Sequence, residues 1–358
     1  MIINFITSNK GGGAELLVHE LHKQFMTTKN QCFSYYFDGD PSILTSNEKI
    51  FNLNRKNPIN IIYIRKYLKH HLQKTKKPLI IHAHLTWPFF YSTLASLGLK
   101  NINLIYTEHS TYNKRRKIFI FKYIDRFFYS RFKKIICISD GVHNSLSKWV
   151  GPELSKRLIV IKNGSRLFDL INRPHLEGRK PRIISIGSLT HKKNFITAIR
   201  AIDKIRDSIE SYIIIGEGVE RKILEDEIKK LKLQDKVFLP GWSNDIQTSL
   251  HYADLQLIPS LWEGFGLVAV EGMSTGLPII ASDIDGLREV LNEKNPAVFL
   301  VKNIQSPDAW AKTLNQAIIQ LKSSDMQLFA SAARKQAEKF SLKMMAKSYL
   351  NVYATLTN

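Results

Sequence analysis

Two glutamates, Glu263 and Glu271, lie eight positions apart in residues 259–271, a glycine-containing segment that follows an apolar run. Gly264 and Gly266 carry no side chain, so the backbone amides at the start of the next helix can approach an anion such as a diphosphate. Glu263 lies in the loop and would face a sugar, whereas Glu271 lies further into the helix and would accept hydrogen bonds from a ribose. Surface glutamates are usually only solvated, but the apolar neighbours of Glu271 predict a buried partner for it.

A pair of lysines forms a second candidate for chemistry. Lys192 and Lys193 lie in the segment 185–194, directly after another apolar run. A lysine at the end of a strand can neutralise the charge that develops on a departing nucleoside diphosphate, a task that a metal ion performs in other sites. The alternative is that both lysines are only solvated.

Three consecutive glycines, residues 11–13, follow the first apolar run and precede a predicted helix. They would let the backbone approach a ligand and leave the amides at the helix N-terminus free for an anion. The spacing is not G-x-G-x-x-G, and a tight turn between a strand and a helix explains the glycines equally well.

The elements that must position these residues form a repeated strand and helix pattern. Short apolar runs rich in β-branched residues alternate with longer helical patterns, which predicts parallel sheets with ligands beyond the carboxyl ends of the strands. The expected strands are 2–7, 79–83, 104–107 and 135–138 in the first half, and 182–186, 212–215, 236–239, 255–259, 278–281 and 297–301 in the second.

A polar stretch with two prolines and a glycine, residues 172–181, separates the two halves and is typical of a linker. The length of 358 residues also suits two domains. We therefore expect two domains, over 1–170 and 171–340, followed by a C-terminal segment over 341–358.

Several short motifs occur in a characteristic order. They are Gly12-Gly13-x-Glu15, Gly187 with Lys193 six residues on, Gly216-Glu217-Gly218 followed by Arg221, Phe238-Leu239-Pro240-Gly241, and Glu263-Gly264-Phe265-Gly266-Leu267 through Glu271. Together they resemble the GT-B glycosyltransferases of family 4, whose E-x7-E element has the spacing of the two glutamates. The resemblance covers essentially the whole chain. It implies an α/β GT-B fold, with two Rossmann-like doubly wound domains facing across a cleft. The N-terminal domain, 1–170, would bind the acceptor and the C-terminal domain, 171–340, the nucleotide sugar, and a C-terminal helix over 341–358 would return to pack on the N-terminal domain.

The resemblance also implies a donor, a nucleotide sugar linked to UDP or GDP, and a role for each matching residue. Lys193 would grip the phosphates, Glu263 would contact the donor sugar, and Glu271 would hold the ribose. His109 would face the reacting sugar, although the residue alone indicates only a packed histidine at a strand end. The backbone would supply the remaining contacts, from Phe265, Gly266 and Leu267 to the diphosphate beside Gly264, from Gly241 to the base, and from Gly12 and Gly13 over the phosphates.

The chain departs from the family pattern at two places. Ser188 stands where arginine is frequent, so one phosphate contact is either missing or supplied by Lys192. Asn163-Gly164 is followed here by Ser165 and Arg166, whereas in the family an aspartate commonly follows this pair.

The reaction implied by the resemblance retains the anomeric configuration without an enzymic nucleophile. We expect a front-face displacement in which the leaving diphosphate helps to deprotonate the acceptor, so that catalysis consists mainly of positioning and electrostatics. No metal or other cofactor is expected. The strings Asp38-Gly39-Asp40 and Asp283-Ile284-Asp285 resemble the metal-binding pair of the other glycosyltransferase fold, but we interpret both as turn residues.

Positive charge is concentrated in the first half of the chain. Residues 1–165 carry 26 Lys and Arg against 9 Asp and Glu, whereas residues 166–358 carry 26 against 22. Such asymmetry indicates an anionic partner: nucleic acid, a membrane surface or a phosphorylated substrate. The two cysteines form no disulfide framework, and no signal peptide or membrane-spanning run is recognised. We therefore expect a cytoplasmic protein that can associate peripherally with the cytoplasmic face of the inner membrane.

The segment 114–134 holds nine basic residues and one acidic residue. Phe121, Ile124, Phe128 and Phe132 recur at helical spacing, so we expect an apolar helical face opposite a cationic one. This pattern suits either an anionic membrane surface or a core helix with solvated lysines, and both can hold at once. The cations expected to meet the membrane or the acceptor are Arg115, Arg116, Lys117, Lys122 and Arg126.

A membrane-facing helix makes a lipid-linked saccharide the expected acceptor, in the synthesis of a bacterial surface polysaccharide such as lipopolysaccharide, O-antigen or capsule. Two other functions remain open. A sugar-nucleotide epimerase or a phosphorylase has a related two-domain architecture, and fold alone does not determine chemistry. A nucleic-acid-binding protein would explain the basic first half, but not the ordered glycines and glutamates of the second.

Overall fold

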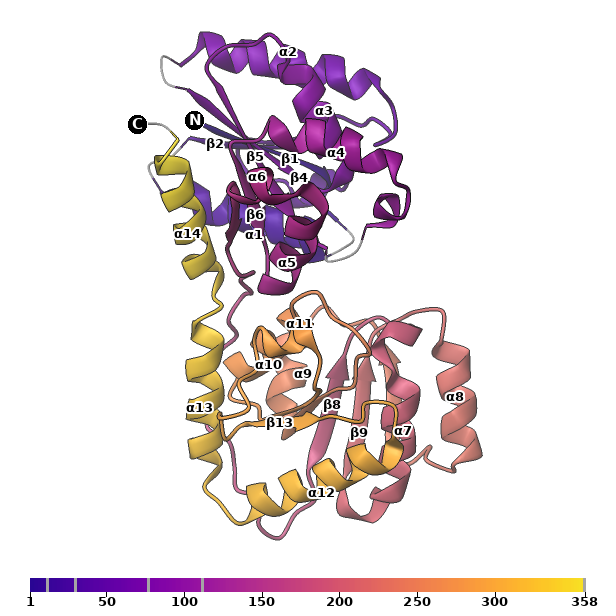
Figure 1. Ribbon diagram of the computed structural model, residues 1–358. Helices are drawn as coiled ribbons and strands as arrows, with labels where there is room; N and C mark the ends of the chain where they lie inside the picture. Colours follow the sequence, from indigo (N-terminus) through magenta and orange to yellow (C-terminus); the bar gives the residue numbers. More distant parts are fainter. Residues whose placement is uncertain (11–12, 29–30, 76–77, 111–112, 357–358) are drawn as a thin grey trace. The chain divides into compact units, whose positions relative to one another are not determined.

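The structure is a computed structural model that describes residues 1–10, 13–28, 31–75, 78–110 and 113–356. The chain divides into two compact units, coloured along the sequence in Figure 1: unit 1 comprises residues 1–164 and 342–358, and unit 2 comprises residues 165–341. The boundary expected at 170/171 therefore falls a short way inside unit 2. Each unit has its own sheet and its own core.

Unit 1 is built on a seven-stranded sheet in which all neighbouring strands are parallel. The spatial order is β3-β2-β1-β4-β5-β6-β7, so the chain starts at a middle strand, builds one edge and then crosses over to build the other. This is a doubly wound arrangement. The strands are β1 (Ile2–Ser8), β2 (Cys32–Asp38), β3 (Glu48–Ile50), β4 (Leu79–His84), β5 (Ile102–Glu108), β6 (Lys134–Cys137) and β7 (Leu158–Val160).

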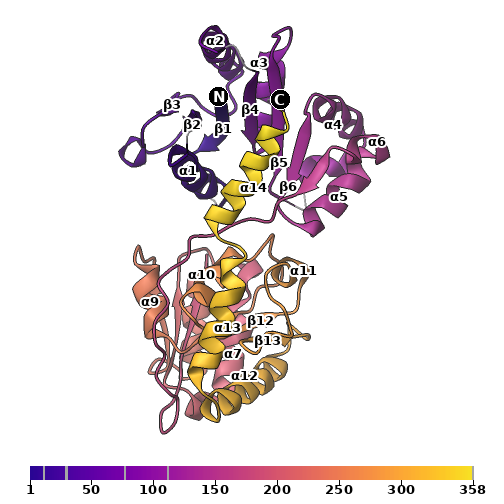
Figure 2. The same cartoon turned by 90° about the vertical axis from the view of Figure 1, so that its left-hand side faces the viewer.

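Helices cover both faces of the unit 1 sheet, because successive side chains of a strand point to opposite faces. Ile3 and Phe5 of β1 belong to the cluster covered by α2 to α5, whereas Ile2 belongs to the cluster covered by α1 and the C-terminal helix α14. Figure 2 shows α14 beside α1, although the two are far apart in sequence. The helices are α1 (Gly13–Met26), α2 (Ile59–Gln73), α3 (Thr86–Ser96), α4 (Ile120–Ser130), α5 (Asp140–Val150), α6 (Pro152–Ser155) and α14 (Leu342–Ala354).

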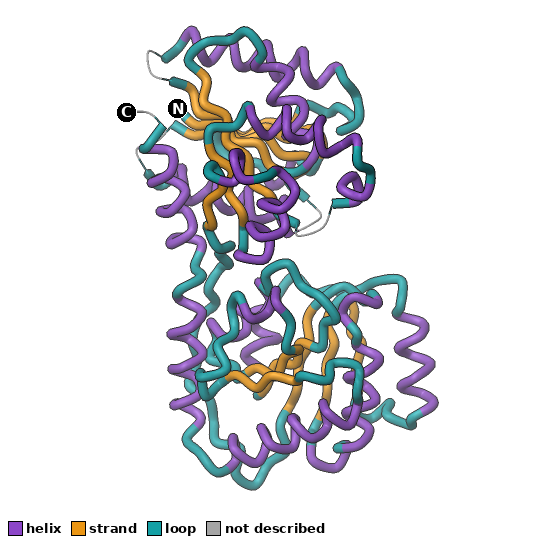
Figure 3. The backbone as a smooth tube through the Cα atoms, in the orientation of Figure 1, coloured by secondary structure: helices purple, strands orange, loops and turns teal. Residues whose placement is uncertain are grey.

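Unit 2 contains a six-stranded parallel sheet with the order β10-β9-β8-β11-β12-β13. Its strands are β8 (Arg182–Ile186), β9 (Ser211–Ile215), β10 (Val237–Gly241), β11 (Leu255–Ile258), β12 (Ile279–Ser282) and β13 (Val298–Val301). Its helices are α7 (Phe195–Lys204), α8 (Arg221–Lys230), α9 (Ile246–Tyr252), α10 (Leu267–Ser274), α11 (Asp285–Arg288), α12 (Pro307–Lys322) and α13 (Met326–Glu338). Figure 3 shows the strands of each unit as an inner layer with helices around it.

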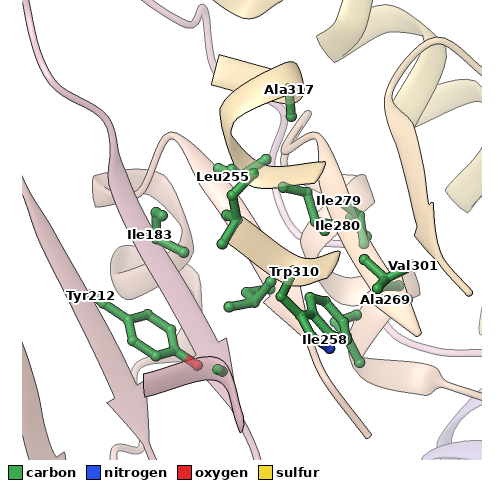
Figure 4. Packing of buried hydrophobic residues seen from close by; sticks show 14 of the residues in the cluster. Ile183, Tyr212, Leu255, Ile258, Ala269, Ile279, Ile280, Val301, Trp310 and Ala317 are labelled. Carbon is green, nitrogen blue, oxygen red and sulfur yellow. The ribbon is translucent and has the colours of Figure 1, made fainter. Parts of the chain in front are cut away.

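The core of unit 2 lies between this sheet and its helices, as Figure 4 shows from close by. Trp310 of α12 is fully buried against the sheet and donates its indole N–H to the backbone carbonyl of Ile304 at 3.0 Å. Tyr212 is also fully buried, and its hydroxyl lies 2.8 Å from the hydroxyl of Ser185. These large side chains keep their polar atoms hydrogen-bonded, as buried Trp and Tyr residues require.

The predicted fold class is confirmed: two Rossmann-like domains with parallel sheets. All ten strands expected from the sequence are present, with ends that shift by one or two residues. Strands β2, β3 and β7 were not predicted. None of the described helices combines the length and the apolar character needed to cross a bilayer.

Candidate active site

The turn between β11 and α10 depends on one glycine. Gly266 precedes the helix with φ of +77°, a left-handed conformation that side chains disfavour. A Cβ atom at this position would lie 2.7 Å from Cδ2 of Leu287. Helix α10 then begins at Leu267, and the first amides of a helix have no partner within it, so the turn presents donors suited to an anion.

Glu263 lies in this turn between the two predicted lysines. Its Oε1 accepts from Lys193 Nζ at 2.5 Å and from the Ser260 hydroxyl at 2.8 Å, and its Oε2 lies 3.2 Å from Lys192 Nζ. Burial raises the pKa of the Glu263 carboxyl, but the two ammonium groups more than offset this, and the pKa is lowered. The structure therefore brings together a carboxylate and two cations that the sequence carries in separate motifs.

Lys193 is held by the turn that follows β8. This turn is a 3-10 helix (His191–Lys193) that ends at Asn194, whose amide donates to the backbone carbonyls of Pro259 and Ile304. The lysine side chain passes over Gly187, because a Cβ on that glycine would lie 3.0 Å from Lys193 Cε. The absence of a side chain at Gly187 leaves room for this path of the lysine. Ser188, the next residue, is exposed and makes no such contact.

Glu271 lies on α10 and has the partner that the sequence predicted without identifying it. Its Oε1 accepts from Arg166 Nε at 3.3 Å and from the Ser165 hydroxyl at 3.4 Å. Burial raises the pKa of the Glu271 carboxyl, and Arg166 offsets this only in part. Arg166 also stacks over the ring of Phe168, at 4.6 Å from its centroid.

Gly241 ends β10, and its backbone is hydrogen-bonded to the residue that follows the neighbouring strand β9. Gly241 has φ of +93° and its carbonyl accepts from the amide of Gly216 at 2.9 Å. A Cβ there would lie 2.9 Å from Glu217 Oε1, and Glu217 is paired with Arg221 at 2.7 Å. Beside Gly241 lies an apolar pocket of about 360 Å³, lined in part by Trp242 and by side chains of β8, β9 and α9.

The other predicted residues around the start of α10, Gly264, Phe265 and Leu267, differ in how far they are enclosed. Phe265 is buried, and its ring packs edge-on against Phe340 with centroids 5.7 Å apart, so only its backbone is available to a ligand. Gly264 has open space around it. Leu267 is partly buried at the first turn of α10.

In unit 1, histidines gather at the carboxyl ends of β4 and β5. His84 Nδ1 lies 3.2 Å from His109 Nε2, and the ring of His82 lies next to that of His84 with centroids 4.0 Å apart. A neutral imidazole carries one donor and one acceptor nitrogen, so one of the two facing nitrogens donates and the other accepts. The tautomers of His84 and His109 are therefore coupled. His109 was predicted from the sequence, but His84 was not.

These histidines are held in the neutral form. Desolvation lowers the pKa of His109 to about 4 and places the pKa values of His82 and His84 well below the ordinary range. His82 is fixed on both sides, since its Nδ1 lies 2.6 Å from the Tyr353 hydroxyl of α14 and its Nε2 lies 2.7 Å from the Thr107 hydroxyl. A neutral His109 can hydrogen-bond to a sugar hydroxyl without bringing a charge.

The glycine loop of unit 1 is described only in part. Gly12 lies outside the described residues. Gly13 begins α1 and is exposed, and a Cβ atom placed on it would have nothing within 4 Å. The hydroxyl of Thr7 donates to Glu15 at 3.3 Å, which ties the end of β1 to the first turn of α1.

Two of the predicted surface cations face inward. Arg115 Nε donates to Asp125 Oδ2 at 3.0 Å, and Arg116 Nη2 donates to Glu108 Oε2 at 2.8 Å. The expectation that these two arginines meet a membrane or an acceptor is therefore corrected: each neutralises a buried acid of unit 1, which would otherwise be a costly unpaired charge. The other three cations keep surface positions, with Lys117 and Arg126 exposed and Lys122 half-buried.

The two D-x-D strings occupy turns. Asp40 accepts from the amide of Ser42 at 2.9 Å and caps a short 3-10 helix (Pro41–Ile43), and Asp283 is paired with Arg288 at 2.5 Å. Among the residues that the structure describes, no group of three or more His, Cys, Asp and Glu side chains is arranged to hold a metal ion.

The two halves of the chain match two family models. Residues 11–166 match the model described as Glycosyltransferase Family 4, and residues 169–336 match the model described as Glycosyl transferases group 1. Together the models cover both the histidine cluster of unit 1 and the Glu263 and Glu271 region of unit 2.

Two relatives from Escherichia coli resemble part of the chain. The O-antigen biosynthesis glycosyltransferase WclY is 26% identical over 231 residues, which make up 63% of this chain and 62% of the relative. A UDP-Gal:alpha-D-GlcNAc-diphosphoundecaprenol alpha-1,3-galactosyltransferase is 29% identical over 243 residues, or 60% of each protein. The matches to the first curated relatives span only 44% to 62% of their own length.

A solved structure resembles the chain over its full length. The crystal structure of Anabaena HepE in complex with UDP and glucose has a TM-score of 0.80 with 18% identity, and the match covers 99% of both chains. At this identity the likeness shows a shared fold.

Proposed function

This chain belongs to the family 4, group 1 glycosyltransferases with a GT-B fold, and we propose that it transfers a sugar from a UDP- or GDP-linked donor to a lipid-linked saccharide. The reaction retains the anomeric configuration and needs no metal. The observation that carries this proposal is the grouping of Glu263, Lys192 and Lys193 beside the glycine turn that starts α10. Such a site offers cations and backbone amides to a diphosphate and a carboxylate to a sugar.

Each predicted site residue of unit 2 has a proposed role in holding the donor. Lys193 would leave its pairing with Glu263 in part to neutralise the diphosphate, and the freed Glu263 oxygen would accept hydrogen bonds from the donor sugar. Glu271 would exchange its long contact with Arg166 for the two hydroxyls of the ribose. The backbone of Phe265, Gly266 and Leu267 would contact the diphosphate.

The base of the nucleotide is assigned to the backbone at Gly241. HepE, which shares the fold, was solved in complex with UDP, so uridine is the first donor base to test. Guanosine remains the second candidate, because carboxylates that hold a ribose do not distinguish the base. Ser188 stands where relatives often have an arginine, so Lys192 would make the phosphate contact that this arginine would otherwise make. The ammonium of Lys192 already lies 3.2 Å from the carboxylate of Glu263.

The proposed chemistry is a front-face displacement. The bond between the anomeric carbon and the phosphate oxygen breaks, the acceptor oxygen bonds to the same face of the sugar, and the departing diphosphate takes the acceptor proton. Lys193 stabilises the charge on the leaving group, and neutral His109 donates or accepts one hydrogen bond at the sugar. Since no side chain becomes covalently attached, positioning supplies most of the rate.

The acceptor is assigned by class. One relative is named for an acceptor carried on diphosphoundecaprenol and another for O-antigen biosynthesis, which supports a lipid-linked saccharide of a bacterial surface polysaccharide. We place the enzyme in the cytoplasm, at an anionic membrane surface, because both cysteines are free and buried and unit 1 is strongly basic.

The proposal is tested by following nucleoside diphosphate release and sugar transfer from UDP-glucose, UDP-galactose, UDP-N-acetylglucosamine and GDP-mannose to a bacterial lipid extract. We expect one donor to be consumed and its sugar to enter the lipid fraction. Lys193→Ala is expected to be about 1000-fold less active, and Lys229→Ala, a change at an exposed lysine of α8, fully active. Conversion of a donor without any acceptor would indicate an epimerase instead. No turnover with any donor would contradict the proposal.

A further inference from the structure

Helix α4 and the residues before it expose an unusual number of large apolar side chains. Six of them are between 39% and 69% exposed within a span of ten residues, and we call them the α4 surface: Ile118, Phe119, Ile120, Tyr123, Ile124 and Phe127. Single exposed apolar residues are ordinary, but a contiguous group of this kind marks an interaction site.

The outward direction of these side chains is set by a buried charge. Asp125 is completely buried, and its Oδ2 accepts from Arg115 Nε at 3.0 Å and from Trp149 Nε1 at 2.9 Å. Tyr129, one turn later, is also buried and donates to Glu108 at 3.0 Å. These polar contacts fix the rotation of α4, so its only acid points inward and its exposed side turns to solvent.

The side of α4 that faces unit 1 is already packed against other rings. Beside the buried Tyr129, the partly buried ring of Phe128 packs against Phe89 and Phe90 at 5.9 Å and 4.7 Å between centroids. Arg115 lies over the same two rings and closes this side. The helix is thus apolar on both sides, a pattern typical of helices that meet protein on one face and lipid on the other.

Cations surround the α4 surface. Lys122 and Arg126 lie on the helix itself, Lys117 precedes it and Arg131 follows it, with Lys122 half-buried and the others exposed. The single acid of residues 114–134 is the buried Asp125, so the exposed part of this segment carries only positive charge. A partner for this surface must offer both apolar volume and negative charge.

We propose that the α4 surface inserts into the headgroup region of an anionic lipid leaflet, with Phe119 and Phe127 as anchors and the flanking cations on the lipid phosphates. A helix lying in the interface buries its apolar face among the acyl chains, while Lys and Arg extend to the headgroups. Nucleic acid fits less well, because isoleucines such as Ile118 and Ile120 offer no stacking surface to bases. The proposal deepens the lipid-linked acceptor proposed above, but lipid binding itself requires no donor or acceptor.

Binding is measured by sedimentation of the full chain with vesicles of phosphatidylcholine alone and with vesicles that contain about 30% phosphatidylglycerol, which gives the surface a negative potential. We expect binding to the anionic vesicles only. Phe119→Ser with Phe127→Ser is expected to weaken it about 100-fold, and Lys122→Ala with Arg126→Ala about 25-fold.

Matched controls carry the same changes elsewhere. Ile319→Ser with Leu328→Ser removes two apolar residues that are equally exposed on α12 and α13, and Lys229→Ala with Lys230→Ala removes two exposed cations of α8. Both controls are expected to bind like the wild type. Thermal melting of every variant verifies that the chain remains folded.

Insertion itself is read from a fluorophore attached at Phe127→Cys. The native thiols do not interfere, because burial raises the pKa of Cys32 and of Cys137 to about 12 and both are enclosed. We expect a blue shift on adding anionic vesicles, and none for the same dye at Leu328→Cys.

Four results would overturn the proposal. They are equal binding to neutral vesicles, anionic binding that the double phenylalanine variant retains, an α4 surface that mediates a dimer in sedimentation velocity, and oligonucleotide binding without vesicle binding. The transferase proposal is judged separately from nucleoside diphosphate release, so a failure of vesicle binding leaves that assay intact.

Discussion

The two units share one architecture and differ in the chemistry at their strand ends. Unit 2 places acids paired with cations there, with Glu263 between two lysines and Glu271 beside an arginine. Unit 1 places neutral histidines at the corresponding ends of β4 and β5. A doubly wound sheet therefore determines where a site lies but not what charge the site carries.

The two units also use their positive charge differently. In unit 2 the site lysines are paired with a carboxylate inside the site, which suits a polyanionic ligand that displaces the pairing. In unit 1 the excess of cations lies outside the histidine cluster, much of it around α4. These differences are consistent with the donor site proposed for unit 2 and the acceptor site proposed for unit 1.

Removing the lysine of the unit 2 site is expected to have the strongest consequence. Lys193→Ala leaves Glu263 with a weaker partner and removes the cation beside the leaving diphosphate, so we expect kcat/KM to fall about 1000-fold. Lys192→Ala, whose ammonium lies 3.2 Å from the same carboxylate, is the control and is expected to lose about tenfold. Steady-state kinetics with the accepted donor measures both. Equal losses in the two variants would contradict the separate role given to Lys193.

Acid is expected to unfold unit 1 before unit 2. Unit 1 holds its histidines neutral with lowered pKa values, about 4 for His109 and about 4 for His71, so the unfolded chain binds more protons at pH values between these and 6.5. Stability from these groups is complete above pH 6.5 and is lost as the pH falls towards 4, at about 3 kcal/mol for a histidine with this shift.

The carboxylates of unit 2 respond in another pH range. The lowered pKa of Glu263 costs stability only as the pH falls below 4.5, and the raised pKa of Glu271 makes mild acid slightly stabilising. Hydrogen exchange at about pH 5 and about pH 7, corrected for the intrinsic exchange rate, separates the units. Faster opening of unit 2 under the acidic condition would contradict this assignment.

A glycine pair within one loop gives a smaller effect on stability. Gly266→Ala must place a side chain at φ of +77° and against Leu287, so we expect a loss of about 2 kcal/mol in the free energy of unfolding. Gly264→Ala, two residues earlier, meets open space and is expected to be neutral or slightly stabilising. Urea denaturation followed by tryptophan fluorescence compares the two variants. Equal destabilisation would show that the turn does not depend on the conformation of Gly266.

The histidine pair of unit 1 is expected to give the weakest response. His84→Ala removes the ring that hydrogen-bonds to His109 Nε2 and orients it, so we expect kcat to fall about tenfold while KM for the donor stays unchanged. His84→Asn offers a donor and an acceptor again and is expected to recover part of the loss. A changed donor KM would assign His84 to binding, and identical losses in the two variants would contradict a positioning role.

Much of the fold was predictable because buried parallel strands appear in the sequence as apolar runs. Ten strands were found this way, whereas β2 escaped because it contains no β-branched residue and Ser34 interrupts its aromatic run. The three-residue strands β3 and β7 are too short to show any period. Local pattern thus identified the central layers of both units but not their short edges.

The site was predictable where one segment carries its own chemistry, and not where distant segments meet. Glu263, Lys193 and Glu271 were found from their positions after strands and from the family motifs. Arg166 was missed as the partner of Glu271 because the two are 105 residues apart and no local spacing relates them. His84 was missed for the same reason, since its contact with His109 joins two strands.

The rotation of α4 shows the limit of helical periodicity. The spacing of Phe121, Ile124, Phe128 and Phe132 predicted one apolar face that either the core or a membrane could cover, but the structure divides it: Phe132 is fully buried, whereas Ile124 is 39% exposed. The buried pair of Arg115 and Asp125 sets the rotation instead, and a pattern of apolar residues contains no information on such a pair. Only the burial of Asp125, which the sequence does not reveal, gives the correct rotation.

The donor site is tested by calorimetric titration of UDP, GDP, ADP and CMP into the wild-type chain and into Glu271→Ala. Arg166→Ala serves as the control, since its partly exposed pairing with Glu271 contributes little on its own. We expect one nucleoside diphosphate to bind the wild type and the control alike, and to bind Glu271→Ala about tenfold more weakly or worse. Binding of none of them, or equal affinity for Glu271→Ala, would contradict the assignment of unit 2 as the donor-binding domain.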